Sequence, residues 1–196
     1  MVSAKNARRA ATLALVGLGC QLLGALIIGV PGGQAAALAV IAAFYLLTGY
    51  AAYLLKSQIA IVAAVAGLAL TALPIASMVP SWSANVAVNL IYIVLYLPMQ
   101  RAFDRVLYDA DVSQGTLTLG RCWVVSLLIG RGASMLGFMP YFEGQAELST
   151  AQGQFTMLFR IQLILEIVAL IAAFVSYVCM VRYLWRARGL LEEDAP

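Results

Sequence analysis

Two long stretches of the sequence contain no charged residue, and they restrict the fold more than any other feature. The first extends from Ala10 to Leu55 and the second from Ser57 to Gln100. Each is about twice the roughly 20 apolar residues that cross a bilayer as a helix, so each predicts two membrane spans. Turn signals at Pro31-Gly32-Gly33-Gln34 and at Pro80-Ser81-Trp82-Ser83 divide them.

The composition agrees with a chain embedded in lipid. Of the 196 residues, 63% are hydrophobic and 11% are charged, whereas a soluble domain carries about 25% charged residues. The apolar residues run continuously and do not alternate with polar ones, as the strands of a membrane barrel would require. We therefore predict an all-α, polytopic integral membrane protein, a bundle of six transmembrane helices that forms one membrane domain over residues 1–196. The expected spans are 10–30, 35–55, 58–79, 83–103, 121–140 and 152–183.

The ends of the last helix have recognisable signals. Ser149 with Gln152 three residues later is the pattern of a capping box, which predicts a helix start. Gly189 follows three arginines and is a candidate for the residue just after the helix end. A helix between these points is nearly twice as long as a hydrocarbon core of about 30 Å, so it must tilt or project from the membrane.

The basic residues predict the orientation. With six spans, both termini lie on one side, and no lysine or arginine is expected in a loop on the other side. By the positive-inside rule the termini are cytoplasmic, which indicates a plasma membrane protein, in the cytoplasmic membrane if the cell is prokaryotic. Ten of the twelve basic residues fall on the terminus side: Lys5, Arg8, Arg9, Lys56, Arg101, Arg105, Arg121, Arg182, Arg186 and Arg188.

Several classes of chemistry have no matching residues. The chain has no histidine, which excludes histidine haem ligation, HExxH zinc sites and Ser-His-Asp hydrolysis. Its three cysteines are widely spaced in or beside apolar runs, where they suit small buried hydrophobes. The basic residues form no block, so nucleic acid is not an expected partner. We predict no cofactor, no metal site and no catalytic residue.

Two charged residues fall inside apolar runs, where charge is unfavourable. Arg131 lies ten residues after Arg121, about 15 Å into the membrane by helical rise. Glu166, counted from Gln154, reaches a similar depth on the next helix, with Gln162 one turn before it. An unpaired charge at the bilayer centre costs at least about 2.5–3.5 kcal/mol, so we expect pairing or protonation of Glu166. Two interpretations are open: a solute or proton site, and a structural ion pair that holds the fifth helix to the sixth or faces a partner subunit.

A polar stripe marks the fourth span. Asn85, Asn89, Tyr92 and Tyr96 recur at spacings of three and four, which places them on one helix face. This face could line a pocket for a polar or aromatic ligand. Alternatively, its side chains hydrogen-bond to neighbouring helices and only hold the bundle together.

These observations leave three functions open. The first is a small non-catalytic subunit that packs within or stabilises a larger membrane complex, with other membrane proteins or its own copies as partners in the bilayer. The second is a transporter or solute-binding subunit with a site between the fourth, fifth and sixth helices. The third, a membrane-embedded enzyme, has no acid, base or nucleophile constellation to support it.

Overall fold

The computed structural model describes residues 2–72, 81–109, 114–137 and 157–193, and within these ranges the chain is helical with no strand. The predicted all-helical membrane fold is confirmed. Five helices are long and apolar enough to cross a membrane, and α3 is a shorter apolar helix. The six described helices are α1 (Ala4–Ile28), α2 (Gln34–Leu54), α3 (Gln58–Ala72), α5 (Ser81–Asp109), α6 (Gln114–Gly137) and α8 (Met157–Glu193).

The start of α1 and the connections that follow α1 and α2 have simple local causes in the sequence. The Ser3 hydroxyl caps α1 by accepting a hydrogen bond from the Asn6 N–H at 3.3 Å. The predicted break between α1 and α2 is present, and Gly32 adopts a φ of +78° there, which a residue without Cβ tolerates best. Lys56, with a φ of 55°, makes the short connection between α2 and α3.

The helices extend beyond the apolar spans at the polar boundary. Residues 104–120, which separate the predicted fourth and fifth spans, are helical except for the undescribed residues 110–113. The helix α8 also continues through Gly189 to Glu193, so the prediction of a helix end at Gly189 is wrong. A helix satisfies its own backbone hydrogen bonds and does not need to end where the apolar side chains end. The capping box at Ser149, the break at Pro80 and residues 73–79, 138–140 and 152–156 of the predicted spans lie outside the described residues.

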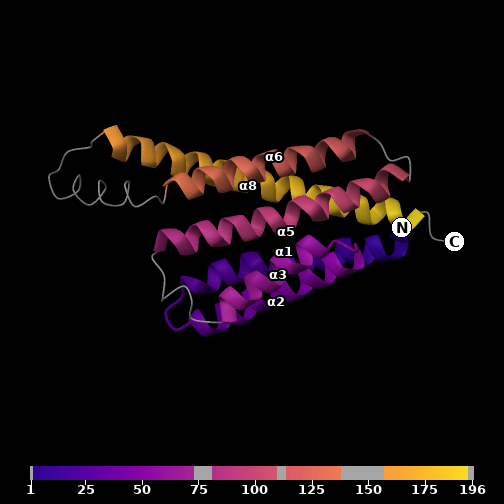
Figure 1. Ribbon diagram of the computed structural model, residues 1–196, viewed down its shortest axis with the longest axis horizontal. Coiled ribbons are helices and arrows are strands. Elements are labelled where there is room, and N and C mark those ends of the chain that lie inside the picture. Colours follow the sequence, from indigo (N-terminus) through magenta and orange to yellow (C-terminus); the bar gives the residue numbers. More distant parts are fainter. Residues whose placement is uncertain (1, 73–80, 110–113, 138–156, 194–196) are drawn as a thin grey trace.

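The helices lie side by side along a common axis (Figure 1), and their contacts close a ring in chain order. Each helix packs against the next described one, and α8 returns to contact α1. Glycines allow α2 to approach α1 and α3 closely, because an added Cβ at Gly24 would lie 2.8 Å from Ile41 and one at Gly49 would lie 3.0 Å from Ala64. Close backbone approach of this kind favours association of helices in lipid.

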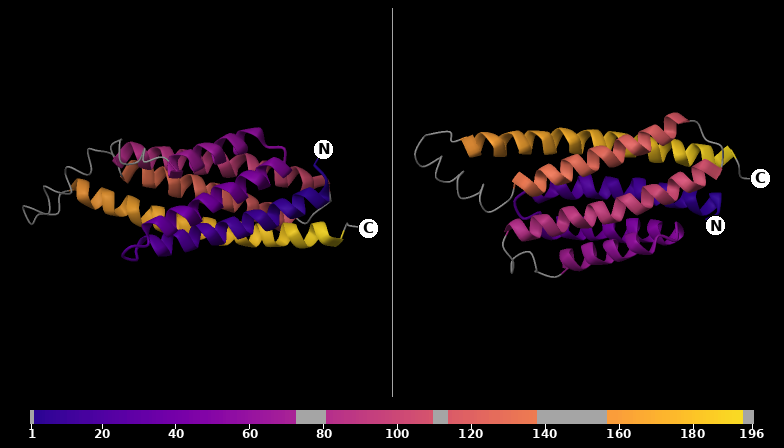
Figure 2. Two further views of the ribbon diagram at one scale, coloured as in Figure 1. Left: turned by 90° about the horizontal axis from the view of Figure 1, so that it is seen from below. Right: turned by 45° about the horizontal axis from the view of Figure 1, so that its top comes forward.

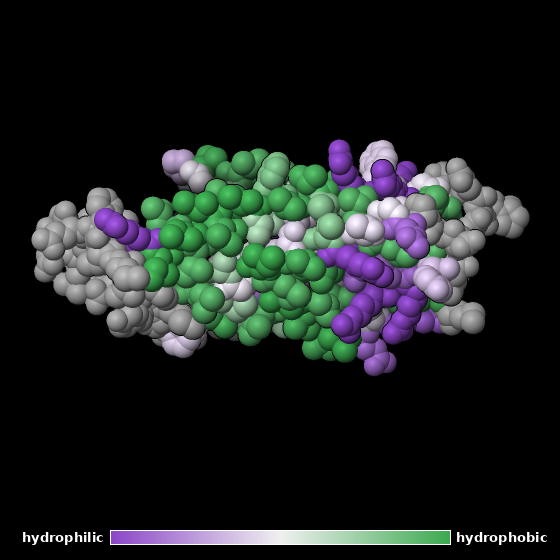
Figure 3. Space-filling model, turned by 90° about the horizontal axis from the view of Figure 1, so that it is seen from above, coloured by the Kyte–Doolittle hydropathy of each residue, from purple (hydrophilic) through white to green (hydrophobic). Residues whose placement is uncertain are grey.

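The start of α1 and the end of α8 lie at the same end of the ring, which we call the basic end (Figure 1). The ten basic residues of the predicted terminus side lie in the connection between α2 and α3 or in the half of their helix nearer this end. Figure 3 shows a broad hydrophobic band on the molecule, with hydrophilic side chains gathered towards the basic end. This distribution is typical of a protein that crosses a membrane with one strongly basic face.

The two halves of α8 differ in their surroundings. From Arg160 to Ile171 no side chain is buried, whereas Ser176, Met180 and Tyr183 and several later residues are. Figure 2 shows this first half at the border of the molecule, away from α2 and α3. It packs against α6 only along one side, so a space opens between α1 and the pair formed by α6 and α8.

Candidate functional site

A cavity of about 390 Å³ lies between α1, α5, α6 and α8. Its lining runs along α6 from Trp123 to Gly137 and along α8 from Glu166 to Met180. Fourteen residues of helix correspond to about 21 Å, so the cavity is long and follows the bundle axis. Its volume is in the range of small-molecule sites, about 300–1,000 Å³. Polar side chains in its lining are Gln21, Tyr96, Trp123, Arg131, Ser134, Glu166, Ser176 and Tyr177.

The polar stripe of α5 faces the interior. Asn89, Tyr92 and Tyr96 are buried, and Asn85 is half-buried. On the opposite side of the same helix, Leu90 is 48% exposed. The tyrosine rings stack on each other with centres 6.1 Å apart. The helical spacing therefore directs this stripe towards α1 and α6, beside the cavity.

Arg131 enters this interior from α6. Its Nη1 donates to Asn89 Oδ1 at 3.2 Å, and its Cζ lies 4.1 Å from the centre of the Tyr92 ring. A guanidinium over an aromatic face is a favourable cation–π arrangement. Among the described side chains, no carboxylate contacts it. The guanidinium is thus held by an amide and a ring, while its other N–H groups have no protein acceptor within the described part of the chain.

A hydrogen-bond network fixes these partners. Asn89 Nδ2 donates to Asn85 Oδ1 at 2.7 Å and to the Ser134 hydroxyl at 3.4 Å. On the other side, Gln21 Nε2 donates to the Tyr92 hydroxyl at 3.0 Å. The network links α1, α5 and α6 and orients Asn89 so that its carbonyl oxygen faces the cation.

The ion pair expected between Arg131 and Glu166 is not formed, although both residues line the cavity. The cause is the register of α6 against α8. A Cβ at Gly137 would lie 4.0 Å from Glu166 Cγ, whereas one at Gly130 would contact Ala172 at 3.2 Å. Glu166 is therefore level with Gly137, about 9 Å further along the helix than Arg131, and not at the depth expected from the sequence.

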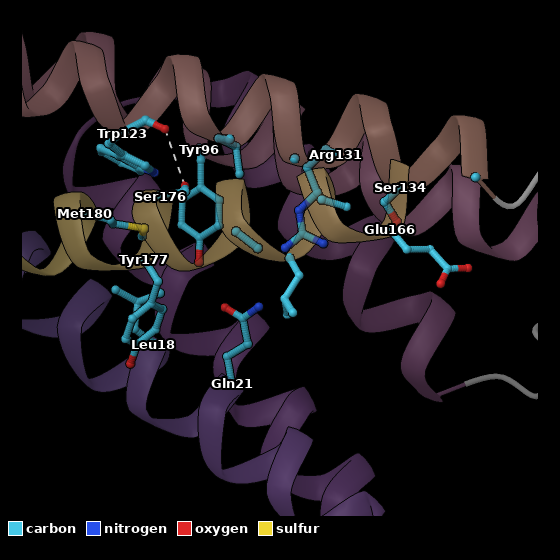
Figure 4. Close-up of a pocket in the computed structure, with 16 residues that line it drawn as sticks. Leu18, Gln21, Tyr96, Trp123, Arg131, Ser134, Glu166, Ser176, Tyr177 and Met180 are labelled. Carbon is cyan, nitrogen blue, oxygen red and sulfur yellow. Dashed lines mark hydrogen bonds between the residues drawn. The ribbon is translucent and has the colours of Figure 1, made fainter. Parts of the chain in front are cut away.

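Glu166 and Gln162 form a hydrogen-bonded polar pair on α8, apart from Arg131. Gln162 Nε2 donates to Glu166 Oε1 at 3.3 Å, and Gln162 Oε1 is buried without a hydrogen-bond partner. Glu166 is exposed as a whole residue. In Figure 4 its carboxylate lies to one side, whereas Arg131, Gln21 and Tyr96 turn towards a common space. Glu166 thus stands at the border of the cavity.

Two further polar groups in the lining have no hydrogen-bond partner. The Tyr96 hydroxyl and the Trp123 Nε1 are buried and unpaired within the described structure, and both side chains line the cavity. A buried donor without an acceptor costs about 1–3 kcal/mol, so these groups are expected to meet a ligand or water. Trp123 and Gln21 were not among the predicted site residues, and their only sequence signal is a polar group within an apolar run.

A separate cluster lies near the basic end. The Tyr183 hydroxyl donates to Asp104 Oδ1 at 2.6 Å, and the amide of Gln100 donates to Asp104 Oδ2. Trp123 lies between this cluster and the cavity, with its ring centre 5.7 Å from that of Tyr183. These rings separate the cavity from the basic end. In the described ranges, no three His, Cys, Asp or Glu residues gather as metal ligands would.

Comparison with known proteins adds no information on function to the geometry of the cavity. No protein family, no curated protein and no solved structure matches the chain.

Proposed function

We propose that this membrane protein binds a small acidic amphiphile in the cavity, as a non-catalytic solute-binding subunit or transporter. Apart from the Glu166 carboxylate at the border of the cavity, every polar side chain of the described lining carries a hydrogen-bond donor. Arg131 and the Trp123 indole can only donate hydrogen bonds, so they favour oxygen acceptors such as those of a carboxylate. Much of the remaining lining is apolar, including Leu18, Leu127 and Met180. An acid group joined to an apolar body complements both parts.

The single observation that carries this proposal is the state of Arg131. Its guanidinium lies deep in the apolar part of α6 without a carboxylate among its described contacts. A cation at this depth is unfavourable by at least about 2.5 kcal/mol, and Asn89 supplies no negative charge. A bound anion would neutralise Arg131 and accept from its remaining N–H groups.

Quenching of Trp123 fluorescence tests the proposal. The variant Trp82→Phe/Trp185→Phe retains Trp123 as its single tryptophan. Trp123 is only 1% exposed and lines the cavity. A quencher dissolved in lipid can therefore contact its ring only after it has entered the cavity. We expect saturable quenching by 11-bromoundecanoate and much weaker quenching by 11-bromoundecanol. Losing a charged hydrogen bond corresponds to about 10- to 100-fold in affinity.

Two arginine variants complete this experiment. Arg131→Gln should lower the affinity for 11-bromoundecanoate by the same factor, whereas Arg160→Gln, also on a membrane helix but not in the cavity lining, should leave it unchanged. Equal quenching by the acid and the alcohol would contradict recognition of an anion. Equal loss in both arginine variants would show that the charge acts on the membrane surface and not in the cavity.

A second candidate function is assembly with another membrane protein. The observation that favours it is the first half of α8, where Leu170 and Ile164 are 72% and 59% exposed and Glu166 is exposed among them. Lipid covers the apolar side chains well but not a carboxylate, which a partner helix could satisfy. Purification in mild detergent should then yield a stoichiometric partner or a defined oligomer. A monodisperse monomer would count against this function.

We also propose that the basic end faces the cytoplasm and that the membrane is the plasma membrane. The positive-inside rule supports this orientation. Cys20, Cys122 and Cys179 can be replaced, and single cysteines introduced at Ser3 and Ser57, both at the basic end. A membrane-impermeant thiol reagent should label them only after the cells are opened. Labelling of intact cells would reverse the orientation.

A further inference from the structure

A second pocket, which we call the basic pocket, lies at the basic end and is separate from the cavity. Its volume is about 630 Å³. Three helices contribute to it: the start of α1, the end of α2 and the end of α8. Its lining consists of Lys5, Arg8, Arg9, Thr12, Leu13, Tyr50, Leu54 and Arg188. Four of these described lining residues are cationic, and none of the described ones is a carboxylate.

The chemistry of the basic pocket changes with depth. Lys5 and Arg9 precede the uncharged run that begins at Ala10, while Thr12 and Leu13 lie about one turn further into it. From α2, Tyr50 likewise lies one turn deeper than Leu54. The cations are therefore at the membrane boundary, with hydroxyl groups and apolar side chains directly beside and below them. A soluble anion would contact the cations alone, whereas a lipid would contact the cations with its headgroup and the hydroxyl groups and apolar side chains with its deeper parts.

Tyr50 gives further evidence for the position of the pocket. It is 56% exposed and stacks on Tyr53, which is 64% exposed, with ring centres 6.2 Å apart. Exposed tyrosines at the end of a membrane helix are typical of the interfacial belt, where the ring lies among lipid headgroups. The pocket and this aromatic pair share α2, so both lie at headgroup level.

We infer that the basic pocket binds the phosphate group of an anionic phospholipid. Arginine forms paired hydrogen bonds with phosphate oxygens, and basic pockets between membrane helices are suited to such headgroups. Like charges held together repel each other, and a bound phosphate removes this repulsion. The lipid joins α8 to α1 and α2 at the point where the ring closes. This inference does not depend on the ligand proposed for the cavity.

Retention of lipid by two charge-matched double variants tests the inference. Arg9→Gln/Arg188→Gln removes two cations of the pocket, and Arg182→Gln/Arg186→Gln removes two from the same end of α8 outside it. Each protein is placed in nanodiscs of phosphatidylcholine with phosphatidylglycerol, and the bound lipid is counted by native mass spectrometry. At about 1 kcal/mol for each basic residue near the surface, the pocket variant should bind phosphatidylglycerol roughly 30-fold more weakly. The control pair lies outside the pocket, so it should weaken the binding clearly less than the pocket pair does.

Further arms separate the possible outcomes. In pure phosphatidylcholine, the pocket variant should melt near the wild-type temperature, because it relieves repulsion between cations and, among the described contacts, loses the long contact of Arg188 with the Trp185 ring. A soluble arm uses glycerol 3-phosphate and inorganic phosphate at millimolar concentration. If these stabilise the protein and no phospholipid is retained, the ligand is a free phosphate and the lipid assignment is overturned. Equal loss of lipid in both double variants, or no retained lipid in the wild type, would also overturn it.

Discussion

The α1–α2–α3 side of the ring and the α5–α6–α8 side are held together in different ways. On the first side, glycines bring the helices so close that an added Cβ at Gly67 would overlap the Tyr45 ring. On the second side, Asn89 and Arg131 join α5 to α6 through side-chain hydrogen bonds. Backbone contact leaves no space, whereas long polar side chains hold helices apart. The cavity therefore lies where α1 meets the polar side.

The α5–α6–α8 side also contains a close contact between small residues. Gly130 of α6 packs against Ala172 and Ala173 of α8 in the same way as the glycines of the first side. Its neighbour Arg131 faces the cavity. Close packing on one face of α6 thus fixes the helix that presents a charged side chain from another face. A rigid small-residue contact supports a polar site, which is how helix bundles build ligand sites in their cores.

The largest effect is expected where packing is closest. Gly67→Ala should destabilise the protein by about 1–3 kcal/mol, because the buried Tyr45 ring must shift and it packs against Phe44 and Tyr92. The matched control is Gly19→Ala, since no atom lies within 4 Å of its added Cβ. That variant should be neutral or gain up to about 1 kcal/mol from helix propensity. Thermal unfolding in detergent compares them, and equal stability of the pair would contradict the packing argument.

On the α5–α6–α8 side, in contrast, removing the side chain of Arg131 should increase stability. Arg131→Met removes a membrane cation whose described contacts include no carboxylate, and it loses the hydrogen bond to Asn89 and the cation–π contact with Tyr92. The cation costs at least about 2.5 kcal/mol, while the hydrogen bond contributes about 0.6 kcal/mol and the cation–π contact at least about 0.5 kcal/mol. We expect stability to rise by up to about 1.5 kcal/mol and binding of 11-bromoundecanoate to be lost. A marked loss of stability would show that Arg131 mainly holds α5 to α6.

Tyr183→Phe tests the contact between α8 and α5 at the basic end. It removes the hydrogen bond that the Tyr183 hydroxyl donates to Asp104 at 2.6 Å and leaves the donor from Gln100 in place. The expected loss in the free energy of unfolding is about 1–2 kcal/mol. This value lies between those of a neutral hydrogen bond between membrane helices and of a hydrogen bond to a charged group. Tyr177→Phe on the same helix is the control, because its hydroxyl has no described protein partner. An equal loss in both variants would assign the effect to the ring environment and not to Asp104.

Much of the fold follows from the sequence because lipid imposes simple rules. The uncharged runs and the turn around Gly32 predict helices and one connection that the structure contains. The spacing of three and four on α5 likewise places Asn89, Tyr92 and Tyr96 on a buried face. Helix ends are less predictable, since α8 continues through Gly189. A polar boundary solvates a projecting helix, and nothing in lipid forces the helix to end there.

The site is less predictable than the fold because it depends on register between helices. Depth counted along each sequence places Arg131 and Glu166 together, but the contact of Gly130 with Ala172 sets α6 against α8 and separates them. The cavity lining also includes Gln21 of α1, which is distant in the sequence from every predicted site residue. Trp123 has only the weak signal of a polar group within an apolar run, which it shares with the interfacial tryptophans that are common in membrane helices.

The smallest expected effect is the coupling between the two charges themselves. If Arg131 and Glu166 do not touch, the stability changes of Arg131→Met and Glu166→Gln should add within about 0.5 kcal/mol in the double variant. A charge exchange, Arg131→Glu with Glu166→Arg, should likewise fail to restore what either single change loses. Asn89 offers the positive control, because it accepts the hydrogen bond from Arg131: Asn89→Leu should couple to Arg131→Met. A coupling above about 1 kcal/mol between Arg131 and Glu166 would mean that the ion pair forms in the membrane, and that α6 and α8 then meet in a different register.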